Sequence, residues 1–140
     1  INAYEGQAAM LLEAVAGQSQ SRPSVTTDLP LLGGDPAVLD WGPCLLDLLA
    51  RQHAGATMAD LAFGFHLALA QGITTVAASV GVERVALTGG CLQNALLTEL
   101  CIDALRAAGM RPYWHQRIPP NDGGLALGQL AAAFDGATGE

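Results

Sequence analysis

The chain is 140 residues long, which is enough for one hydrophobic core and too short for two. Apolar residues make up 51% of it and charged residues only 14%, a composition that excludes an intrinsically disordered protein. The net charge is −7, with six arginines and no lysine, so the chain has no basic face for a nucleic acid to bind.

Other features of the sequence point to the cytoplasm and away from a membrane. The longest apolar stretch, residues 58–82, is interrupted by Asp60, His66 and several small or polar residues. No run therefore reaches the roughly 18 residues of a membrane span. The chain has neither an initiator methionine nor a signal-peptide pattern, and we expect it to begin inside a longer protein.

The cysteines fit a reducing compartment. Cys44, Cys91 and Cys101 are odd in number and form no CxxC pair, which argues against a disulfide framework and against a structural zinc site. Cys91 and Cys101 lie ten residues apart within an apolar helical pattern, so we expect both to be packed in the core.

The first half of the chain has the apolar periodicity of helices. The first predicted helix covers residues 4–16 and ends at Gly17. Its expected inward face consists of Ala8, Leu11, Leu12 and Val15. Residues 18–36 are rich in Ser, Thr, Pro and Gly and predict a long flexible loop.

Two further helices are predicted before the periodicity changes. One covers residues 40–50 and is broadly apolar, with leucines at positions 45, 46, 48 and 49. The other begins after Thr57, whose hydroxyl caps it with Asp60 three residues further on, and runs to about Ser79.

The second half alternates strands and helices. Residues 84–88 predict a buried parallel strand and residues 110–115 a second strand, with a helix over 92–108 between them. This is a βαβ unit with a glycine turn at the carboxyl end of its first strand. The inward face of the helix is expected to hold Leu92, Leu96, Leu100 and Ile102 or Leu105. A final helix covers 125–134, and residues 135–140 form a fraying tail.

These elements predict a helix-rich α/β fold. Two strands are too few for a complete open sheet. We therefore expect them to extend a sheet that other sequence supplies, in preference to an α-rich lobe dominated by its long helices. A lobe without its sheet partners exposes apolar surface, so we expect it to form a homodimer or to be covered in another way.

The strongest local signal is Thr-Gly-Gly-Cys-Leu-Gln-Asn at residues 88–94. Gly89 and Gly90, between a strand and a helix, let backbone amides approach an anion, and the positive end of the helix dipole adds to the attraction. Asn94 is placed to hydrogen-bond a nucleoside. The glycine pair is equally typical of a purely structural turn, and the segment is neither a P-loop nor a dinucleotide-binding fingerprint.

A second segment, Asn121-Asp122-Gly123-Gly124, follows a double proline. Asp122 is placed either to ligate a metal ion or to cap the following helix, and the pattern alone favours capping. Both alternatives put Asp122 near a helix N-terminus, where phosphate and metal could be bound together.

The remaining candidates carry weaker signals. His53 and His115 are isolated, and we expect His66 to be a satisfied core residue on an apolar helix face; the three form no metal-binding pair. Gly6 either lets the backbone approach a ligand closely or only initiates the first helix. No nucleophile elbow supports a serine triad, and no catalytic residue is assigned.

Four stretches, in this order, resemble one family, the carbamoyltransferases of nickel–iron hydrogenase maturation (HypF). They are Tyr4-Glu5-Gly6-Gln7-Ala8-Ala9-Met10, Phe65-His66, residues 87–97, and Pro119-Pro120-Asn121-Asp122-Gly123-Gly124-Leu125-Ala126-Leu127-Gly128-Gln129. The last stretch is the most specific.

The resemblance implies that the chain is the C-terminal lobe of a longer enzyme's domain with the actin/sugar-kinase (ASKHA) type of fold. The enzymes that make threonylcarbamoyladenosine in tRNA share this fold. In the family, an upstream YrdC-like domain makes carbamoyl adenylate from carbamoyl phosphate and ATP. The last domain transfers the carbamoyl group to the C-terminal cysteine of the partner HypE, for the cyanide ligand of iron. The lobe alone would then be inactive.

Roles carry over only where residues match. Gly89, Gly90 and Asn94 match the residues that hold the adenylate, and Gly6 matches a glycine of the nucleotide-binding loop. Asp122 matches the carboxylate that joins two histidines of the first lobe, which this sequence lacks, in holding a divalent metal ion: iron, zinc or magnesium.

Several positions depart from the family's pattern. Leu11 stands where Glu is common, Leu67 where Asn is usual and Ala95 where Arg is usual. Cys91 and Leu92 replace the commoner Val and Phe. These changes leave the adenylate site intact but leave open which molecule accepts the carbamoyl group. The alternative enzyme is an O-carbamoyltransferase acting on a small hydroxylated molecule, and the alternative of another class is a nucleotide-binding or docking lobe without turnover.

Overall fold

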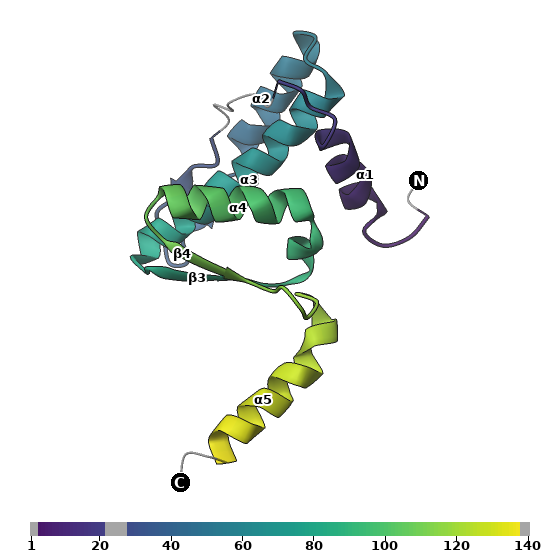
Figure 1. Cartoon of the computed structure of the whole chain (residues 1–140). Helices are drawn as coiled ribbons and strands as arrows, with labels where there is room; N and C mark the ends of the chain where they lie inside the picture. The colour runs from purple at the N-terminus through teal and green to yellow at the C-terminus, as the bar shows by residue number, and fades with distance from the viewer. Residues whose placement is uncertain (1–2, 22–27, 138–140) are drawn as a thin grey trace.

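The computed structural model describes residues 3–21 and 28–137 (Figure 1). In chain order its elements are α1 (Gln7–Ala16), β1 (Leu31–Leu32), β2 (Val38–Leu39), α2 (Gly42–His53), α3 (Met58–Val80), β3 (Arg84–Leu87), the 3-10 turn η1 (Gly90–Gln93), α4 (Ala95–Ala107), β4 (Arg111–Trp114), the 3-10 turn η2 (Asp122–Gly124) and α5 (Leu125–Ala137).

Helix α3 is the packing centre of the molecule. As predicted, Thr57 caps it: its hydroxyl oxygen accepts a hydrogen bond from the Asp60 N–H at 3.1 Å. Gly81 ends it in the left-handed conformation, with a φ of +73°. The buried residues along α3 are mostly small: Ala62, Gly64, Ala68, Ala70, Gly72 and Ala77. Small side chains let α1, α2 and α4 pack closely against it.

By length and hydropathy alone, α3 is also long and apolar enough to cross a membrane, the one such helix among the described residues. This corrects the expectation that no apolar run reaches that length. Within the fold, 44% of its most apolar window is buried. The core helix of a globular domain passes the same test, and contact with α1, α2 and α4 buries part of the apolar surface of α3.

Two hydrophobic clusters adjoin α3. The larger joins it to α4 and β3 and consists of Ala70, Ala77, Leu87, Leu97, Cys101, Ile102 and Leu105. The smaller joins it to α1 through Ala16, Ala62 and Phe63. Burial raises the pKa of the Cys101 thiol to about 11, as expected for a packed core cysteine.

The predicted βαβ unit is confirmed. Strands β3 and β4 pair in parallel, with Arg84 opposite Arg111 and Leu87 opposite Trp114. Helix α4 connects them and lies over one face of the pair (Figure 1). The carboxyl ends of the two strands therefore meet at one edge.

Helix α4 begins at Ala95, later than predicted, because residues 90–93 form η1 instead of the first helical turn. Cys91 therefore precedes the helix and is exposed, and the expectation that it lies in the core is wrong. Leu97, which is not part of the predicted inward face, is buried, while Leu92, Leu96 and Leu100 are only partly buried against the clusters.

The two N-terminal helices also differ from prediction. Helix α1 begins at Gln7 because Gly6 before it has a φ of +82°, outside helical geometry. Leu12 and Val15 pack towards α3 as expected, whereas Leu11 is 57% exposed and Ala8 is exposed. Helix α2 is longer than predicted and buries Cys44, while several of its leucines are exposed: Leu45, Leu46 and Leu49.

Part of the predicted loop 18–36 has regular structure. Strand β1 pairs with β2 in an antiparallel hairpin, with Leu31 opposite Leu39. Two-residue strands are too short for an alternating pattern, so the sequence shows no sign of them. Residues 22–27, at the centre of the predicted loop, lie outside the described residues.

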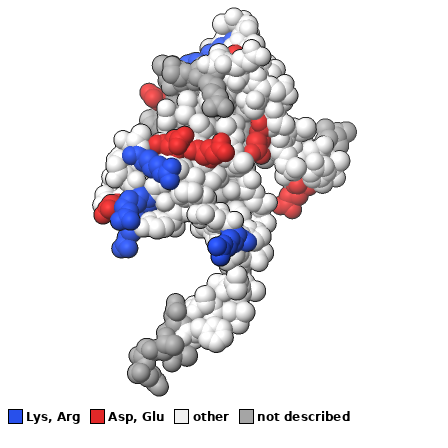
Figure 2. Space-filling view, viewed as in Figure 1, with Lys and Arg blue, Asp and Glu red and all other residues white. Residues whose placement is uncertain are grey.

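Helix α5 projects away from the rest of the molecule (Figure 1). It continues to Ala137, so residues 135–137 belong to the helix and not to a tail; residues 138–140 lie outside the description. Residues 125–134 carry no charge, as the white projecting arm in Figure 2 shows. Leu125, Leu127 and Leu130 are at least half exposed. The expected exposed apolar surface is therefore present, and a homodimer that covers it stays a prediction.

Candidate functional site

Two loops meet at the carboxyl ends of β3 and β4. The Gly89 N–H donates to the Pro120 carbonyl oxygen at 2.8 Å, and the Thr88 hydroxyl lies 3.4 Å from the same oxygen. The glycine pair and the Asn121–Gly124 segment, far apart in the sequence, therefore lie side by side. In α/β folds with parallel strands this edge is where ligands bind.

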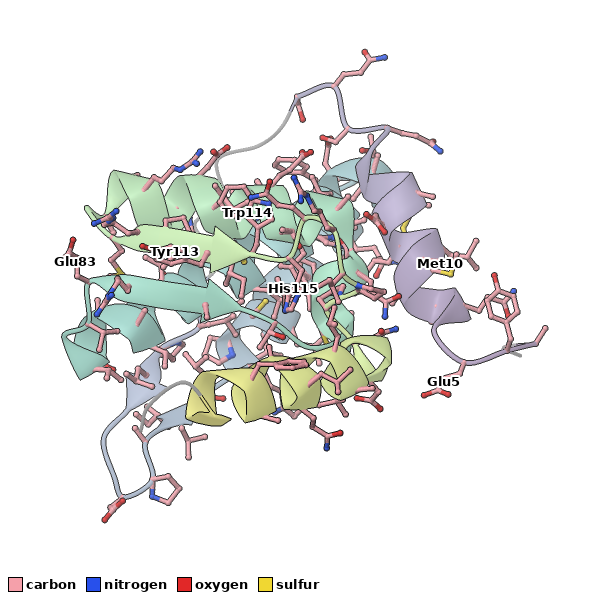
Figure 3. The ribbon with its side chains drawn as sticks, turned by 60° about the horizontal axis from the view of Figure 1, so that its bottom comes forward. Glu5, Met10, Glu83, Tyr113, Trp114 and His115 are labelled. Carbon is pink, nitrogen blue, oxygen red and sulfur yellow. The ribbon has the colours of Figure 1, made fainter. Side chains whose placement is uncertain are left out.

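His115 also belongs to this edge, although the sequence leaves it isolated. Its Nε2 lies 3.0 Å from the Thr88 hydroxyl oxygen. His115 follows β4 directly and Thr88 follows β3, so this hydrogen bond joins the ends of the two strands. Figure 3 shows His115 beyond Tyr113 and Trp114, at the end of β4.

Gly89 and Gly90 are glycines for different reasons. Gly89 has a φ of +103°, a conformation that favours glycine. Gly90 has no such φ, and a Cβ added to it would meet no atom within 4 Å. The fold of this chain therefore does not require glycine at position 90, whereas close approach of a bound molecule would.

The turn after the glycine pair presents unused backbone donors. Within the described residues, the N–H groups of Gly90 and Cys91 donate to no acceptor, and both residues are exposed. The Leu92 N–H closes the turn by donating to the Gly89 carbonyl oxygen at 3.0 Å. Adjacent free N–H groups in such a turn are suited to an anion.

The N-terminus of α4, by contrast, is closed. The Asn94 side-chain oxygen accepts from the Leu97 N–H at 2.8 Å. The Glu13 carboxylate, from α1, accepts from the N–H groups of Ala95 at 2.7 Å and Leu96 at 3.2 Å. This corrects the expectation that the dipole of this helix helps to bind an external anion, because a carboxylate of the chain already occupies that place.

Asn94 makes a second contact, with His66 of α3. Its side-chain nitrogen lies 2.9 Å from the Nε2 of His66, whose Nδ1 lies 2.8 Å from the Ala62 carbonyl oxygen. His66 is only 3% exposed, which confirms the expectation of a satisfied core histidine. The hydrogen bonds among Glu13, Asn94 and His66 were not predicted from the sequence. The one feature that could have drawn attention to Glu13 is that it is a carboxylate within an otherwise apolar helix.

In the second loop, Asn121 is the capping residue. Its side-chain oxygen accepts from the Gly123 N–H at 3.1 Å, at the start of η2. The interpretation of Asp122 as the cap is therefore wrong. The Asp122 carboxylate is exposed and makes no hydrogen bond or ion pair with the residues that the structure describes. A Cβ added to Gly124 would lie 2.8 Å from the Pro119 carbonyl oxygen, so the turn itself requires this glycine.

The site offers a metal ion one ligand, the Asp122 carboxylate. Among the described residues, no three His, Cys, Asp or Glu side chains are grouped to hold an ion. A carboxylate without another partner suits a divalent cation, so Asp122 fits as a single ligand of a site completed from elsewhere.

Gly6 lies apart from the two loops. It precedes α1 with a φ of +82°, and a Cβ added to it would meet no atom within 4 Å. No hydrogen bond between described residues joins Gly6 to the glycine turn. Its helix is joined to the site through Glu13.

Comparison with known proteins identifies the family. Residues 1–129 match the family described as "Carbamoyltransferase, Kae1-like Domain, second subdomain". The chain belongs to this family. Its helix-rich α/β fold is therefore the second lobe of a Kae1-like domain of the ASKHA type, as the resemblance implies.

The relatives are considerably longer proteins. The carbamoyltransferase HypF of Synechocystis is 38% identical over 133 residues, which cover 92% of this chain and 16% of the relative. A HypF homolog of Cupriavidus necator is 35% identical over 137 residues, 92% of this chain and 34% of the homolog. The chain thus spans about a sixth of the Synechocystis relative and a third of the other.

The fold is similar to a solved HypF structure. The crystal structure of full-length HypF in its phosphate- and nucleotide-bound form matches with a TM-score of 0.80 and 29% identity. The match covers 91% of this chain and 17% of that one.

Proposed function

We propose that this lobe holds carbamoyl adenylate in an enzyme that carbamoylates the C-terminal cysteine of HypE during nickel–iron hydrogenase maturation. The observation that carries the proposal is the 2.8 Å hydrogen bond from the Gly89 N–H to the Pro120 carbonyl oxygen. It puts an open glycine turn and an exposed carboxylate, Asp122, on one surface. The carbamoyltransferase names of the relatives, and the nucleotide in the solved HypF structure, support the same conclusion.

Different residues of the site would bind different parts of the adenylate. The free N–H groups of Gly90 and Cys91 donate to phosphate oxygens of the adenylate. The Asn94 amide, after its contacts with Leu97 and His66, retains one N–H and one acceptor position for the nucleoside. The loop at Gly6, which precedes α1, would contact the nucleotide from the side of α1.

The proposed reaction is acyl transfer to sulfur. The acceptor thiolate attacks the carbamoyl carbon; a C–S bond forms, the C–O bond to the adenylate phosphate breaks, and AMP leaves with the electron pair. The thiol proton passes to solvent. Donors held on the phosphate oxygens stabilise the charge on the leaving group, which is the contribution of Gly90 and Cys91.

Asp122 fits the role of a metal ligand. A divalent ion (iron, zinc or magnesium) would supply further charge stabilisation to the leaving phosphate. Asp122 would hold it together with ligands from the first lobe. An upstream domain would supply the adenylate from carbamoyl phosphate and ATP, in the cytoplasm, where the free thiols of Cys44, Cys91 and Cys101 stay reduced.

The test uses the complete protein with carbamoyl phosphate and ATP. Purified HypE, its variant lacking the C-terminal cysteine, and a panel of small hydroxylated molecules are offered as acceptors, and products are identified by mass spectrometry. We expect one carbamoyl group on the HypE cysteine and none on the variant. Carbamoylation of a hydroxylated molecule with HypE unmodified would establish an O-carbamoyltransferase. Nucleotide binding without transfer to any acceptor would establish a binding or docking lobe.

A further inference from the structure

The side-chain amide of Asn94 is held at both ends. Its oxygen accepts from the Leu97 N–H at 2.8 Å, and its nitrogen lies 2.9 Å from the His66 Nε2. The first contact caps α4. The second crosses from α4 to α3 and reaches an imidazole that is only 3% exposed.

The hydrogen-bond partners determine the orientation of both side chains. The Ala62 carbonyl oxygen can only accept, so the His66 Nδ1, 2.8 Å away, carries the hydrogen and Nε2 is left as an acceptor. The Leu97 N–H can only donate, so it requires the amide oxygen of Asn94. A flipped amide would place two donors together at Leu97 and two acceptors together at His66.

The neighbours of His66 keep its ring in this position. The Phe65 ring meets the imidazole edge to face, with centroids 6.1 Å apart and an interplanar angle of 84°. The flanking residues of α3 on its buried face, Ala62 and Ala70, pack against α1 and α4. The acceptor at Nε2 is therefore preorganised.

We infer that His66 is a positioning residue: it orients the Asn94 amide so that the second N–H and the second oxygen lone pair face the bound nucleotide. This inference rests on the proposed function, because it assigns His66 a part in nucleotide recognition. His66 itself touches no nucleotide in this arrangement and acts through Asn94. A purely structural histidine at this buried position would also need partners for its ring nitrogens, so the effect of His66 on nucleotide binding is what distinguishes the two roles.

Two substitutions of His66 by an amide residue distinguish the contact made by Nε2 from the contact made by Nδ1. The amide oxygen of His66→Gln lies about where Nε2 was, so this variant keeps the acceptor for Asn94 and loses the contact with Ala62. The shorter amide of His66→Asn lies about where Nδ1 was, so it keeps the Ala62 contact and loses Asn94. Both variants change the volume and polarity of the core in similar ways, which makes each the control for the other.

The experiment measures the inhibition constant of AMP, the leaving group, for carbamoyl transfer by the complete protein. We expect Asn94→Ala to raise this constant about tenfold, the effect of one lost hydrogen bond. His66→Asn should raise it to a similar extent with kcat nearly unchanged, and His66→Gln should stay within about twofold of the native value. In the double variant Asn94→Ala/His66→Asn the effects should not add, since both act on one contact.

Pyrophosphate release, which reports adenylate formation upstream, and the unfolding temperature are measured for every variant. A native inhibition constant in His66→Asn, or equal increases in His66→Asn and His66→Gln, would overturn the positioning role. If His66→Asn gives such a result while Asn94→Ala still raises the inhibition constant, only the role of His66 is overturned and the proposed function stands. An Asn94→Ala enzyme with native AMP inhibition would instead remove Asn94 from the nucleotide site, and the role of His66 with it.

Discussion

Two glycine pairs lie at the same edge of the β3–β4 sheet, and they are glycine for different reasons. At the second pair, atoms of the chain itself leave no room: added Cβ atoms would lie 3.1 Å from the Asn121 side-chain oxygen and 2.8 Å from the Pro119 carbonyl oxygen. At the first pair, Gly89 is required by its positive φ, whereas Gly90 has open space around it. A substitution at position 90 should therefore affect ligand binding without affecting the stability of the fold.

The largest effect is expected from Gly90→Val. The added side chain should block close approach of the adenylate and abolish carbamoyl transfer by the complete protein, while the unfolding temperature stays near native. Transfer is measured by mass spectrometry of HypE and unfolding by calorimetry. The matched variant, Gly89→Ala, should instead lower stability by roughly 1–3 kcal/mol because of its strained φ. Native transfer kinetics in Gly90→Val would show that the open space is not a ligand site.

A similar loss is expected from Asp122→Asn, by another cause. The substitution removes the negative charge that a hard cation needs, so metal content and transfer should collapse while adenylate formation upstream persists. Metal is measured by elemental analysis of the purified protein. Unfolding should stay near native because Asn121, and not Asp122, caps the turn.

Asn121→Ala is the control for this result. Loss of its cap should cost about 1 kcal/mol of stability and leave the metal bound. An Asp122→Asn enzyme that retains its metal and carbamoylates its acceptor normally would take Asp122 out of the site.

The sequence predicts the parts of this edge that depend on local pattern. The strands around residues 84–88 and 110–115, their parallel pairing and the Thr57 cap all follow from periodicity and nearby residues, and the structure confirms them. The meeting of the two motif loops was not predicted, although it agrees with the rule that the carboxyl ends of parallel strands share an edge.

Contacts between distant segments could not be predicted in the same way. Glu13 meets the N-terminus of α4, and His66 meets Asn94, only because α1 and α3 pack beside that helix. Periodicity identifies which face of a helix is apolar but not which residue it meets across an interface. The start of α4 was missed for a related reason: Leu92 continues the apolar pattern of the helix, although it belongs to a 3-10 turn.

A smaller effect, on stability alone, is expected from Gly124→Ala. Its Cβ must displace the Pro119 carbonyl, at a cost of roughly 1–3 kcal/mol. Gly128→Ala lies in α5, and its added Cβ would meet no atom within 4 Å. This substitution should instead stabilise α5 by roughly 0.5–1 kcal/mol through helix propensity. Unfolding followed by calorimetry of the complete protein distinguishes the two. Equal effects of the two substitutions would contradict the tight turn.

The smallest effect is expected at the closed end of α4, which contrasts with the open turn before it. Glu13→Gln keeps an oxygen that can accept from the Ala95 and Leu96 N–H groups but removes the charge at the helix N-terminus, worth roughly 0.3–1 kcal/mol. Glu13→Ala removes the acceptor as well. Hydrogen–deuterium exchange of the peptide covering the start of α4 should therefore be slowest in the native protein, faster in Glu13→Gln and fastest in Glu13→Ala. If Glu13 takes the place of an external anion, neither variant should weaken inhibition by AMP, because the proposed site for the nucleotide phosphate is at Gly90 and Cys91. Weaker AMP inhibition in Glu13→Gln would show instead that the N-terminus of α4 and the turn at Gly90 and Cys91 bind the nucleotide as one site.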